Sequence, residues 1–303
     1  MTVLEAIQKS ADFLGKKGVE SPRLHAELLL AHQLQLPRMK LYLNFDRGLT
    51  PAETDGLREL IKRRAAREPL QHITGSTSFC GHEIAVNRHA LVPRPETELL
   101  AELGGKFLAE RRPPVRREGE SLSPAGPAAG APTALDFGTG TGCIAIALAV
   151  GCPDARITAL DVSPEALVLA RQNAAQNKVA ERIEFLTGDG FAALKNAGAP
   201  ERPFDLIISN PPYIASAEIA TLEPEVRDFD PRAALDGGAD GLDFYRRLVA
   251  EAKPWLKPDG KIMLEFGDGQ AGAIQQIFAA EKWIVEAVQE DYSHRARILV
   301  AKM

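Results

Sequence analysis

The spacing of apolar residues separates a helical first part of the chain from a longer part in which strands and helices alternate. In the first part, apolar residues recur every three or four positions, as in Val3, Leu4, Ile7, Ala11 and Leu14. This spacing predicts an amphipathic helix. From Ala134 onward, short apolar runs alternate with helical patterns, which predicts a parallel sheet with helices on both faces. We therefore expect an α/β fold preceded by a small helical domain.

Capping residues mark the expected helix starts in the first part. Two pairs fit the capping box, in which a Thr and a Glu each accept a backbone N–H of the other residue: Thr2 with Glu5, and Thr50 with Glu53. Ser21 followed by Pro22 predicts a further start, with Ser21 as the N-cap.

The helix that starts after Thr50 carries four cations near its carboxyl end, Lys62, Arg63, Arg64 and Arg67. Cations at this end complement the helix dipole, so we interpret them as a solvated helix end. Binding of an acidic partner is the alternative interpretation.

The region between the two parts has short, glycine-broken strands, and residues 84–86 suggest a β-hairpin. A helix is expected at about residues 95–110. The stretch that follows is rich in Pro, Ala, Gly and Arg, a composition that predicts a flexible loop. We therefore expect a helical domain over residues 1–68, a β-hairpin linker over 69–93, and an α/β domain over 94–303 that contains a flexible insertion at 111–132.

A glycine-rich turn follows the first strand of the α/β domain. The strand at 133–137 leads into Gly138-Thr139-Gly140-Thr141-Gly142, and an apolar helix comes next. Glycines permit positive φ and let a backbone approach a ligand closely. The Gly-x-Gly-x-Gly spacing differs from the Gly-x-Gly-x-x-Gly of dinucleotide sites, and no Lys follows as a phosphate-binding P-loop requires.

Two acids end the next two expected strands. Asp161 ends the strand at 157–161, where a carboxylate can accept both hydroxyls of a ribose. Asp189 ends the strand at 183–189. A third acid, Glu265, lies at the end of a later strand; we interpret it as solvated, with a role in the site as the alternative.

Asn210-Pro211-Pro212-Tyr213 follows the apolar strand at 204–209. Two consecutive prolines cannot continue a sheet ladder, so Asn210 is held at the carboxyl edge of the strand, where open α/β sheets bind ligands. The Asn210 side-chain oxygen and the Pro211 carbonyl make two acceptors for one planar NH2 group. By itself, the motif leaves a polar turn open as the alternative.

Taken in order, the glycine-rich loop, the two strand-end acids and Asn-Pro-Pro-Tyr resemble the S-adenosylmethionine-dependent methyltransferases of the Rossmann-like class. This resemblance implies a seven-stranded sheet with one reversed edge strand. Further segments resemble the protein-(glutamine-N5) methyltransferases that modify peptide chain release factors (the PrmC/HemK family): residues 69–75, 79–81, 91–98, 230–242 and 291–297. The similarity covers nearly the whole chain and is weakest over about the first sixty residues.

The family resemblance implies methyl transfer from S-adenosylmethionine to the side-chain N5 of the glutamine in the Gly-Gly-Gln motif of class 1 release factors. It implies cofactor contacts at Gly138, Thr139, Gly140, Thr141, Gly142, Asp161, Asp189, Gly190 and Asn210, with Glu96 and Thr97 closing over the cofactor. Catalysis is expected at Asn210, Pro211 and Tyr213, and substrate binding at these residues and Pro212. Relatives often have an aromatic residue directly after the last Asp, whereas this chain has Gly190 and then Phe191.

Composition indicates the cellular compartment and the kind of partner that we expect. Net charge is −5 and the sequence pI about 5.8, a balance that argues against a direct nucleic-acid substrate. Three cysteines without paired spacing predict a reducing compartment, and the sequence shows neither a secretory signal nor a membrane span. His72, His82 and His89 lack metal-ligand spacing. We expect a cytoplasmic, monomeric enzyme without a metal, whose partner is a release factor.

Two other functions are considered. Adenine N6 and guanine N2 present a similar planar NH2, so a nucleic-acid amino methyltransferase is one alternative. It would need a basic channel or a target-recognition domain, and the N-terminal helices are small and mixed in charge. The other is a cofactor-binding scaffold without catalysis, which the intact Asn-Pro-Pro-Tyr disfavours.

Overall fold

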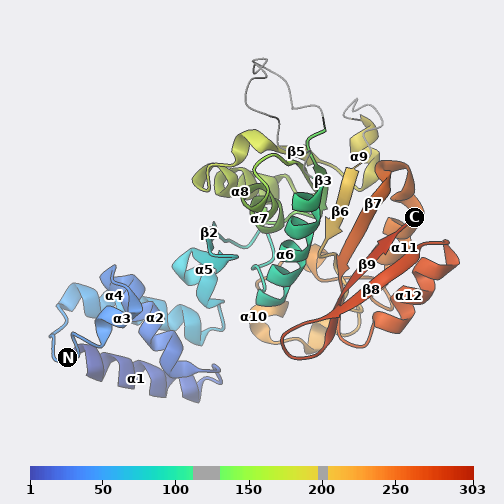
Figure 1. Ribbon diagram of the computed structural model, residues 1–303. Helices are drawn as coiled ribbons and strands as arrows, with labels where there is room; N and C mark the ends of the chain where they lie inside the picture. The colour runs from blue at the N-terminus through green and yellow to red at the C-terminus, as the bar shows by residue number, and fades with distance from the viewer. Residues whose placement is uncertain (112–129, 197–203) are drawn as a thin grey trace, which may run out of the picture. The chain divides into compact units, whose positions relative to one another are not determined.

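The computed structural model describes residues 1–111, 130–196 and 204–303. The chain forms two compact units (Figure 1). The first comprises residues 1–76 together with 222–229, and the second comprises residues 77–221 and 230–303. Most of the insertion that we predict at 111–132 lies outside the described residues. The three-part division at residues 68 and 93 stays a prediction.

The first unit is helical. Its helices are α1 (Val3–Lys16), α2 (Pro22–Leu34), α3 (Arg38–Leu41), α4 (Pro51–Ala65), α5 (Leu70–Thr74) and α10 (Pro224–Arg227). Both predicted capping boxes are confirmed, because in each pair the Thr and the Glu side chain accept the expected backbone N–H. The prediction for Ser21 is wrong in part: α2 begins at Pro22, but Ser21 has a positive φ and its side chain makes no capping bond.

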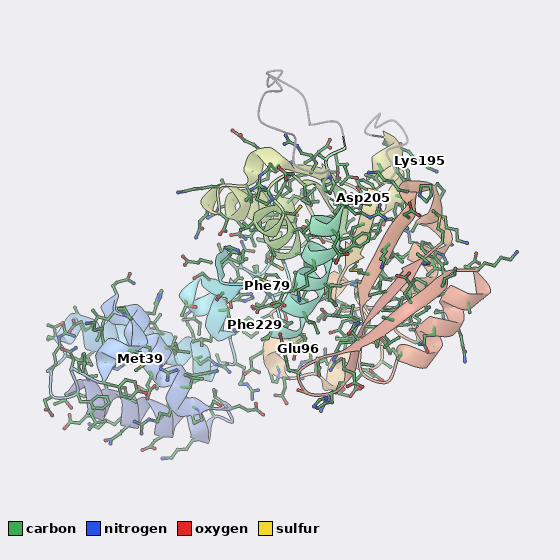
Figure 2. The ribbon with its side chains drawn as sticks, in the orientation of Figure 1. Met39, Phe79, Glu96, Lys195, Asp205 and Phe229 are labelled. Atoms are coloured by element: carbon green, nitrogen blue, oxygen red, sulfur yellow. The ribbon has the colours of Figure 1, made fainter. Side chains whose placement is uncertain are left out.

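The apolar faces of α1, α2 and α4 form the core of this unit, with Ile7, Leu14, Leu30 and Ile61 all buried. Large apolar side chains also remain on its surface. Met39 is 69% exposed and Leu43 is 76% exposed; Met39 is labelled in Figure 2.

The cations of α4 correct one expectation. Arg64 is buried and Arg67 is half-buried, and both are bound by acids, so neither belongs to a solvated helix end. Their guanidinium groups pair with Glu225 in α10, and Arg67 also pairs with Glu223 just before it. The acidic partner is therefore a distant segment of the same chain, which the charge pattern of α4 alone could not identify.

The second unit contains a hairpin and a large sheet. The hairpin pairs β1 (Ser76–Phe79) with β2 (His82–Ala85). The sheet has seven strands in the order β5-β4-β3-β6-β7-β9-β8. Its strands are β3 (Thr133–Phe137), β4 (Arg156–Asp161), β5 (Ile183–Thr187), β6 (Phe204–Ser209), β7 (Leu256–Glu265), β8 (Ile284–Glu290) and β9 (Ala296–Lys302). The predicted α/β fold with a seven-stranded sheet is confirmed.

The reversed strand does not lie at the edge, and this expectation is wrong. β9 runs antiparallel to both of its neighbours, β7 and β8, and β8 forms the edge. Burial explains the order. The run from Ile298 to Ala301 in β9 is buried on both faces, whereas Ile284 at the start of β8 is exposed. The more apolar strand therefore lies inside the sheet.

Helices cover both faces of the sheet (Figure 1). One face packs against α6 (Pro95–Glu110), α7 (Cys143–Gly151) and α8 (Pro164–Gln176); the other packs against α9 (Phe191–Asn196), α11 (Asp243–Glu251) and α12 (Ala271–Ala280). Successive residues of β3 pack into the hydrophobic clusters on opposite faces of the sheet. Ala134 packs on the first face and Leu135 on the second. This two-sided burial is typical of parallel sheets.

Asp205 joins the amino ends of three strands (labelled in Figure 2). Its carboxylate accepts hydrogen bonds from the Thr133 backbone and hydroxyl at the start of β3 and from Lys257 in β7, and it pairs with Arg111. In the part of the chain that the structure describes, no helix has both the length and the apolar character needed to cross a bilayer.

Candidate active site

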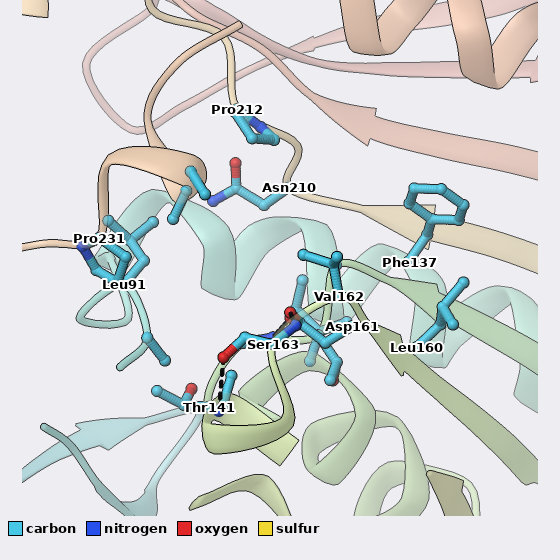
Figure 3. A pocket seen from close by; sticks show the side chains of 18 of the residues that line it. Leu91, Phe137, Thr141, Leu160, Asp161, Val162, Ser163, Asn210, Pro212 and Pro231 are labelled. Atoms are coloured by element: carbon cyan, nitrogen blue, oxygen red, sulfur yellow. Dashed lines mark hydrogen bonds between the residues drawn. The ribbon is translucent and has the colours of Figure 1, made fainter. Parts of the chain in front are cut away.

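A pocket lies where the chain leaves the carboxyl ends of β3, β4, β5 and β6. Figure 3 shows Asn210 and Asp161 among the side chains that line it. Its wall contains most of the residues expected to bind a cofactor, namely Gly138, Thr139, Gly140, Thr141, Asp161, Asp189, Gly190 and Asn210. Gly142 is not among its lining residues; it precedes α7, and a Cβ there would meet the Ala170 backbone.

The turn after β3 has a conformation that requires glycine. Gly138, Gly140 and Gly142 all have φ between 55° and 81°, a region that other residues adopt only with strain. The backbone N–H groups of Gly138 and Thr139 both donate to the Leu160 carbonyl in β4. A Cβ added to Gly138 would have no neighbour within 4 Å, so the backbone there is open to a ligand.

Asp136, in β3 directly before this turn, stabilises it by hydrogen bonds. It is fully buried, and its Oδ2 accepts bonds from the Thr139 hydroxyl at 2.6 Å and the Ala145 N–H at 3.1 Å. Burial raises the pKa of Asp136 to about 7, although these two bonds act in the opposite direction. The sequence analysis assigns no role to Asp136. The feature that indicates one is its position: an acid between Leu135 and Phe137, in a strand whose other residues are apolar enough to be buried.

Asp161 can bind hydroxyl groups while it holds the turn. Its Oδ2 accepts the Gly140 N–H at 2.8 Å, and its Oδ1 accepts the Ser163 N–H at 2.9 Å. A carboxylate oxygen can accept more than one hydrogen bond, so both oxygens can also accept from a diol. Val162 beside it lines the pocket with an exposed apolar side chain.

Arg247 from α11 lies against Asp189 and Gly190. Its Nη1 is 2.5 Å from Asp189 Oδ1, and its guanidinium occupies the space that a side chain at residue 190 would need. Phe191 does not face the pocket, because its ring is buried against Phe137 and Trp255. The Arg247 guanidinium therefore covers the glycine that follows Asp189.

The Asn-Pro-Pro-Tyr segment is divided between pocket and core. Asn210 and Pro212 line the pocket, whereas Pro211 and Tyr213 are not among its lining residues. Burial raises the pKa of Tyr213 to about 12, and its side chain packs against the core on the α11–α12 face. The expected part of Tyr213 in catalysis and substrate binding stays a prediction.

Glycines let a second segment pack directly on this turn. A Cβ at Gly237 would lie 2.8 Å from the Pro212 carbonyl oxygen, and one at Gly241 would overlap the Tyr213 carbonyl. Ile214 pairs with Asp236 in a short parallel bridge. This backbone-to-backbone packing explains why the stretch at 230–242 carries so many glycines beside the Asn-Pro-Pro-Tyr turn.

Two further residues of the pocket region come from the 91–98 segment. Arg94 pairs with the buried Asp230 at 2.7 Å, which joins two of the segments that carry the family resemblance. Thr97 is buried in the first turn of α6, and its Oγ1 accepts a hydrogen bond from Asn210 Nδ2 at 3.1 Å. The Asn210 side chain is therefore held through its amino group.

Glu265 differs from the expected solvated strand end. It is only 2% exposed, so that interpretation is wrong. Burial raises the pKa of Glu265 to about 7, and a hydrogen bond with Thr97 partly offsets this effect. The last residue of β7 is covered because α6 begins directly against this end of the sheet.

The residues of the pocket fit the groups of S-adenosylmethionine. The open backbone at Gly138 leaves room for the amino-acid part, and Asp161 offers acceptors for a ribose. Apolar side chains, Leu91, Leu160 and Val162 among them, suit a purine face. Among the described residues no group of three or more His, Cys, Asp or Glu could hold a metal ion.

Comparison with known proteins agrees with this geometry. Residues 5–75 match the family model described as the PrmC N-terminal domain, and residues 125–223 match the methyltransferase small domain. Among solved structures, a protein described as a methyltransferase and complexed with SAH superposes with a TM-score of 0.51 at 13% identity, covering 76% of this chain and 56% of that one. This likeness supports the fold.

Curated relatives match over nearly the full length. Release factor glutamine methyltransferase from Geobacter sulfurreducens is 42% identical, with coverage of 92% of this chain and 88% of the relative. The protein of the same name from Deinococcus radiodurans is 39% identical, with coverage of 100% and 99%. On these matches, with the pocket and sheet that they accompany, the chain belongs to the release factor glutamine methyltransferase family.

Proposed function

We propose that this protein transfers the methyl group of S-adenosylmethionine to the side-chain N5 of the glutamine in the Gly-Gly-Gln motif of class 1 release factors. The observation that carries the proposal is the orientation of Asn210. Its amino group is bound by Thr97, so its oxygen is left to accept, in the same pocket as Asp161 and the glycine turn.

The chemistry requires an oriented amide. The lone pair of an amide nitrogen is delocalised into the carbonyl, which makes the nitrogen a weak nucleophile. The Asn210 oxygen and the Pro211 carbonyl accept its two N–H bonds and align the nitrogen with the methyl–sulfur bond. When bound, S-adenosylmethionine would supply an activated methyl group: a carbon–nitrogen bond would form as the methyl–sulfur bond breaks, and a neutral thioether would leave. The alkylated nitrogen then releases one proton to water.

The helical unit supplies surface for a protein partner. A Gly-Gly-Gln loop alone offers little contact area, and stable protein recognition generally needs more. Met39 and Leu43 are strongly exposed apolar side chains on this unit, and exposed apolar groups often mark binding surfaces. We propose that they contact the release factor outside its loop. As part of the same proposal, the enzyme acts as a monomer in the cytoplasm, where release factors work.

The test is an incubation with methyl-labelled S-adenosylmethionine and, in separate reactions, a purified class 1 release factor, DNA and RNA. Label is expected in the release factor, and mass spectrometry should locate it on the glutamine of Gly-Gly-Gln. A release factor whose glutamine is replaced by alanine is the matched control and should take up no label. Label in DNA or RNA, or in the alanine control, would contradict the proposal.

A further inference from the structure

Arg94 is a pocket residue whose positive charge has no part in the proposed reaction. It lies directly before α6, and its side chain lines the pocket and is 34% exposed. Among the described residues that line this pocket, it is the single Arg or Lys, whereas Asp161 and Asp189 are acids. A cation in the wall of a small-molecule pocket can fix the orientation of an anionic group of the ligand.

Asp230 holds the guanidinium of Arg94 by one of its nitrogens. Its Oδ2 accepts a hydrogen bond from Arg94 Nη2 at 2.7 Å, and the Asp230 side chain is 1% exposed. The Arg94 side chain makes no other hydrogen bond with the described residues, although a guanidinium has several more N–H donors. Leu91 and Pro231, which line the pocket from the same two segments, are labelled in Figure 3. Arg94 is therefore fixed at the pocket wall with donors that remain open to a ligand.

The segment that carries Arg94 connects the glycine turn with Asn210. At its start, Ala90 packs on the turn, because a Cβ added to Gly140 would lie 3.8 Å from the Ala90 Cβ. At its end, Thr97 Oγ1 accepts a hydrogen bond from Asn210 Nδ2. The sulfur that carries the reacting methyl group belongs to the methionine part of S-adenosylmethionine. Delivery of that methyl group to a nitrogen held at Asn210 therefore places the methionine part beside this segment.

The glycine turn has few donors left for an anion. Several of its backbone N–H groups are already bonded within the protein, those of Gly138, Thr139, Gly140 and Gly142. The Asn210 amino group is bonded to Thr97. A carboxylate can only accept hydrogen bonds, and its desolvation is costly without them. Within the described part of the pocket, the charged donor that remains for a carboxylate is Arg94.

We propose that Arg94 binds the carboxylate of S-adenosylmethionine as its counter-ion, and that Asp230 positions Arg94 for this contact. The carboxylate is the anionic group of a molecule whose other charges, the ammonium and the sulfonium, are positive. Asp230 does not line the pocket and acts through Arg94. The inference rests on the cofactor of the proposed function and is independent of the methyl acceptor.

The test compares two ligands that differ in this carboxylate, S-adenosylmethionine and decarboxylated S-adenosylmethionine, by calorimetry. Arg94→Met keeps an apolar side chain and removes the charge. The variant should lose about tenfold or more in affinity for S-adenosylmethionine, the scale for a hydrogen bond between charged groups. Its affinity for the decarboxylated ligand should stay within about twofold of the parent, because that ligand has no group for Arg94 to bind.

Arg88→Met is the matched control. Arg88 precedes the same segment, is exposed, and does not line the pocket, so both affinities should equal those of the parent. An equal loss for both ligands in Arg94→Met would overturn the inference, because Arg94 would then only shape the pocket. Parent-like affinity for S-adenosylmethionine in this variant would overturn it as well.

A double variant guards against loss of folding, because Arg94→Met leaves the buried Asp230 without its cation. Arg94→Met with Asp230→Asn removes both charges and should show the same selective loss for S-adenosylmethionine. Asp230→Asn alone keeps the guanidinium but holds it less firmly, so its selective loss should be smaller. A parent-like ratio of the two dissociation constants in Asp230→Asn would overturn the positioning role of Asp230. Methyl transfer to an acceptor other than a release factor would refute the proposed function but not this inference.

Discussion

Arg64 Nη2 lies 2.5 Å from Glu225 Oε1, although 161 positions separate the two residues in the chain. The same carboxylate also binds Arg67 through both of its oxygens. Beside them, Arg64 Nε donates to His25 Nδ1 in α2. The segment that follows the Asn-Pro-Pro-Tyr loop is therefore fixed to α4 by a cluster of charge-assisted hydrogen bonds, which are stronger than neutral ones.

Removal of the Glu225 charge should destabilise the helical unit. Glu225→Ala leaves the buried Arg64 without its counter-ion, and breaking such a pair generally costs about 3–5 kcal/mol. We expect a loss of about 2–4 kcal/mol in the free energy of unfolding, measured with urea. Glu223→Ala is the matched control, because Glu223 is exposed and exposed ion pairs contribute about 0–1 kcal/mol. Equal effects of the two changes would contradict this account.

The same cluster predicts a dependence of stability on pH. Burial alone would raise the pKa of Glu225, but the hydrogen bonds from Arg67 and Arg64 outweigh it and lower the pKa from 4.5 to about 2. The stabilisation is therefore fully present above about pH 5 and is lost as pH falls toward 2. Thermal melting from pH 6 to 3 should show a smaller loss in Glu225→Gln than in the parent.

Asp161→Ala should weaken binding of S-adenosylmethionine. One carboxylate oxygen accepts a hydrogen bond from Gly140 in the turn and the other accepts one from Ser163, and both remain able to accept ribose hydroxyls. Loss of these bonds should cost about 1–3 kcal/mol, or roughly 5- to 150-fold in the dissociation constant. Calorimetry is the measurement, with Glu184→Ala at an exposed strand position as the control. Unchanged affinity in Asp161→Ala would show that this carboxylate does not hold the ribose.

Asn210→Ala should separate catalysis from cofactor binding. The variant loses one acceptor for the reacting amide, and kcat should fall by about 10²–10³, the scale for one oriented polar group at a reacting centre. The cofactor dissociation constant should change little, because Asp161 and the glycine turn are intact. Single-turnover kinetics with a release factor is the measurement. Methyl transfer at the parent rate would mean that Asn210 does not orient the substrate.

Asp205→Ala should reduce stability without a direct effect on the site. Asp205 and Asn210 lie at opposite ends of β6, and the acid binds Thr133, Arg111 and Lys257. Its removal should cost about 2–4 kcal/mol, since it leaves nearby cations and a backbone donor unpaired. At a temperature where the variant is folded, KM for S-adenosylmethionine should equal that of the parent. A selective loss of cofactor binding would contradict this separation.

The exposed apolar residues of the helical unit should influence recognition of the intact substrate. Met39→Glu with Leu43→Glu should raise KM for a release factor by about fivefold or more, but leave KM for a short Gly-Gly-Gln peptide unchanged. Val168→Glu, at a similarly exposed apolar position in α8, is the matched control. Deletion of the helical unit is a poorer test, because it would also remove the partners of α10. Equal changes for protein and peptide would refute the proposed contact.

Local signals in the sequence predicted local structure well. The capping boxes at Thr2 and Thr50 depend on residues three positions apart, and both form. The alternation of strands and helices and the order of glycine turn, Asp161 and Asn210 predicted the sheet and placed these residues on one edge. Such patterns are sufficient because each depends on neighbours in the chain or on the general handedness and packing of parallel strands.

Contacts between distant segments were not predictable in this way. Arg64 and Arg67 look like part of a solvated helix end until the segment around α10 supplies their partner. Glu265 looks like a solvated strand-end acid until α6 covers it. The position of β9 inside the sheet depends on its burial relative to β8, which the apolar run alone did not reveal. The contacts of Asp136 with the glycine turn and of Arg247 with Asp189 likewise depend on the fold, and the residues beside them in the sequence do not indicate them.

The return of residues 222–229 to the helical unit has a consequence for synthesis of the protein. Neither compact unit is a continuous stretch of chain, so the N-terminal helices cannot complete their ion pairs until about three quarters of the chain has been made. During translation, Arg64 and Arg67 must remain hydrated or bind transient partners. The N-terminal unit should therefore reach its full stability late, and a chain that stops before Glu225 should be more sensitive to proteolysis in α4 than the complete protein.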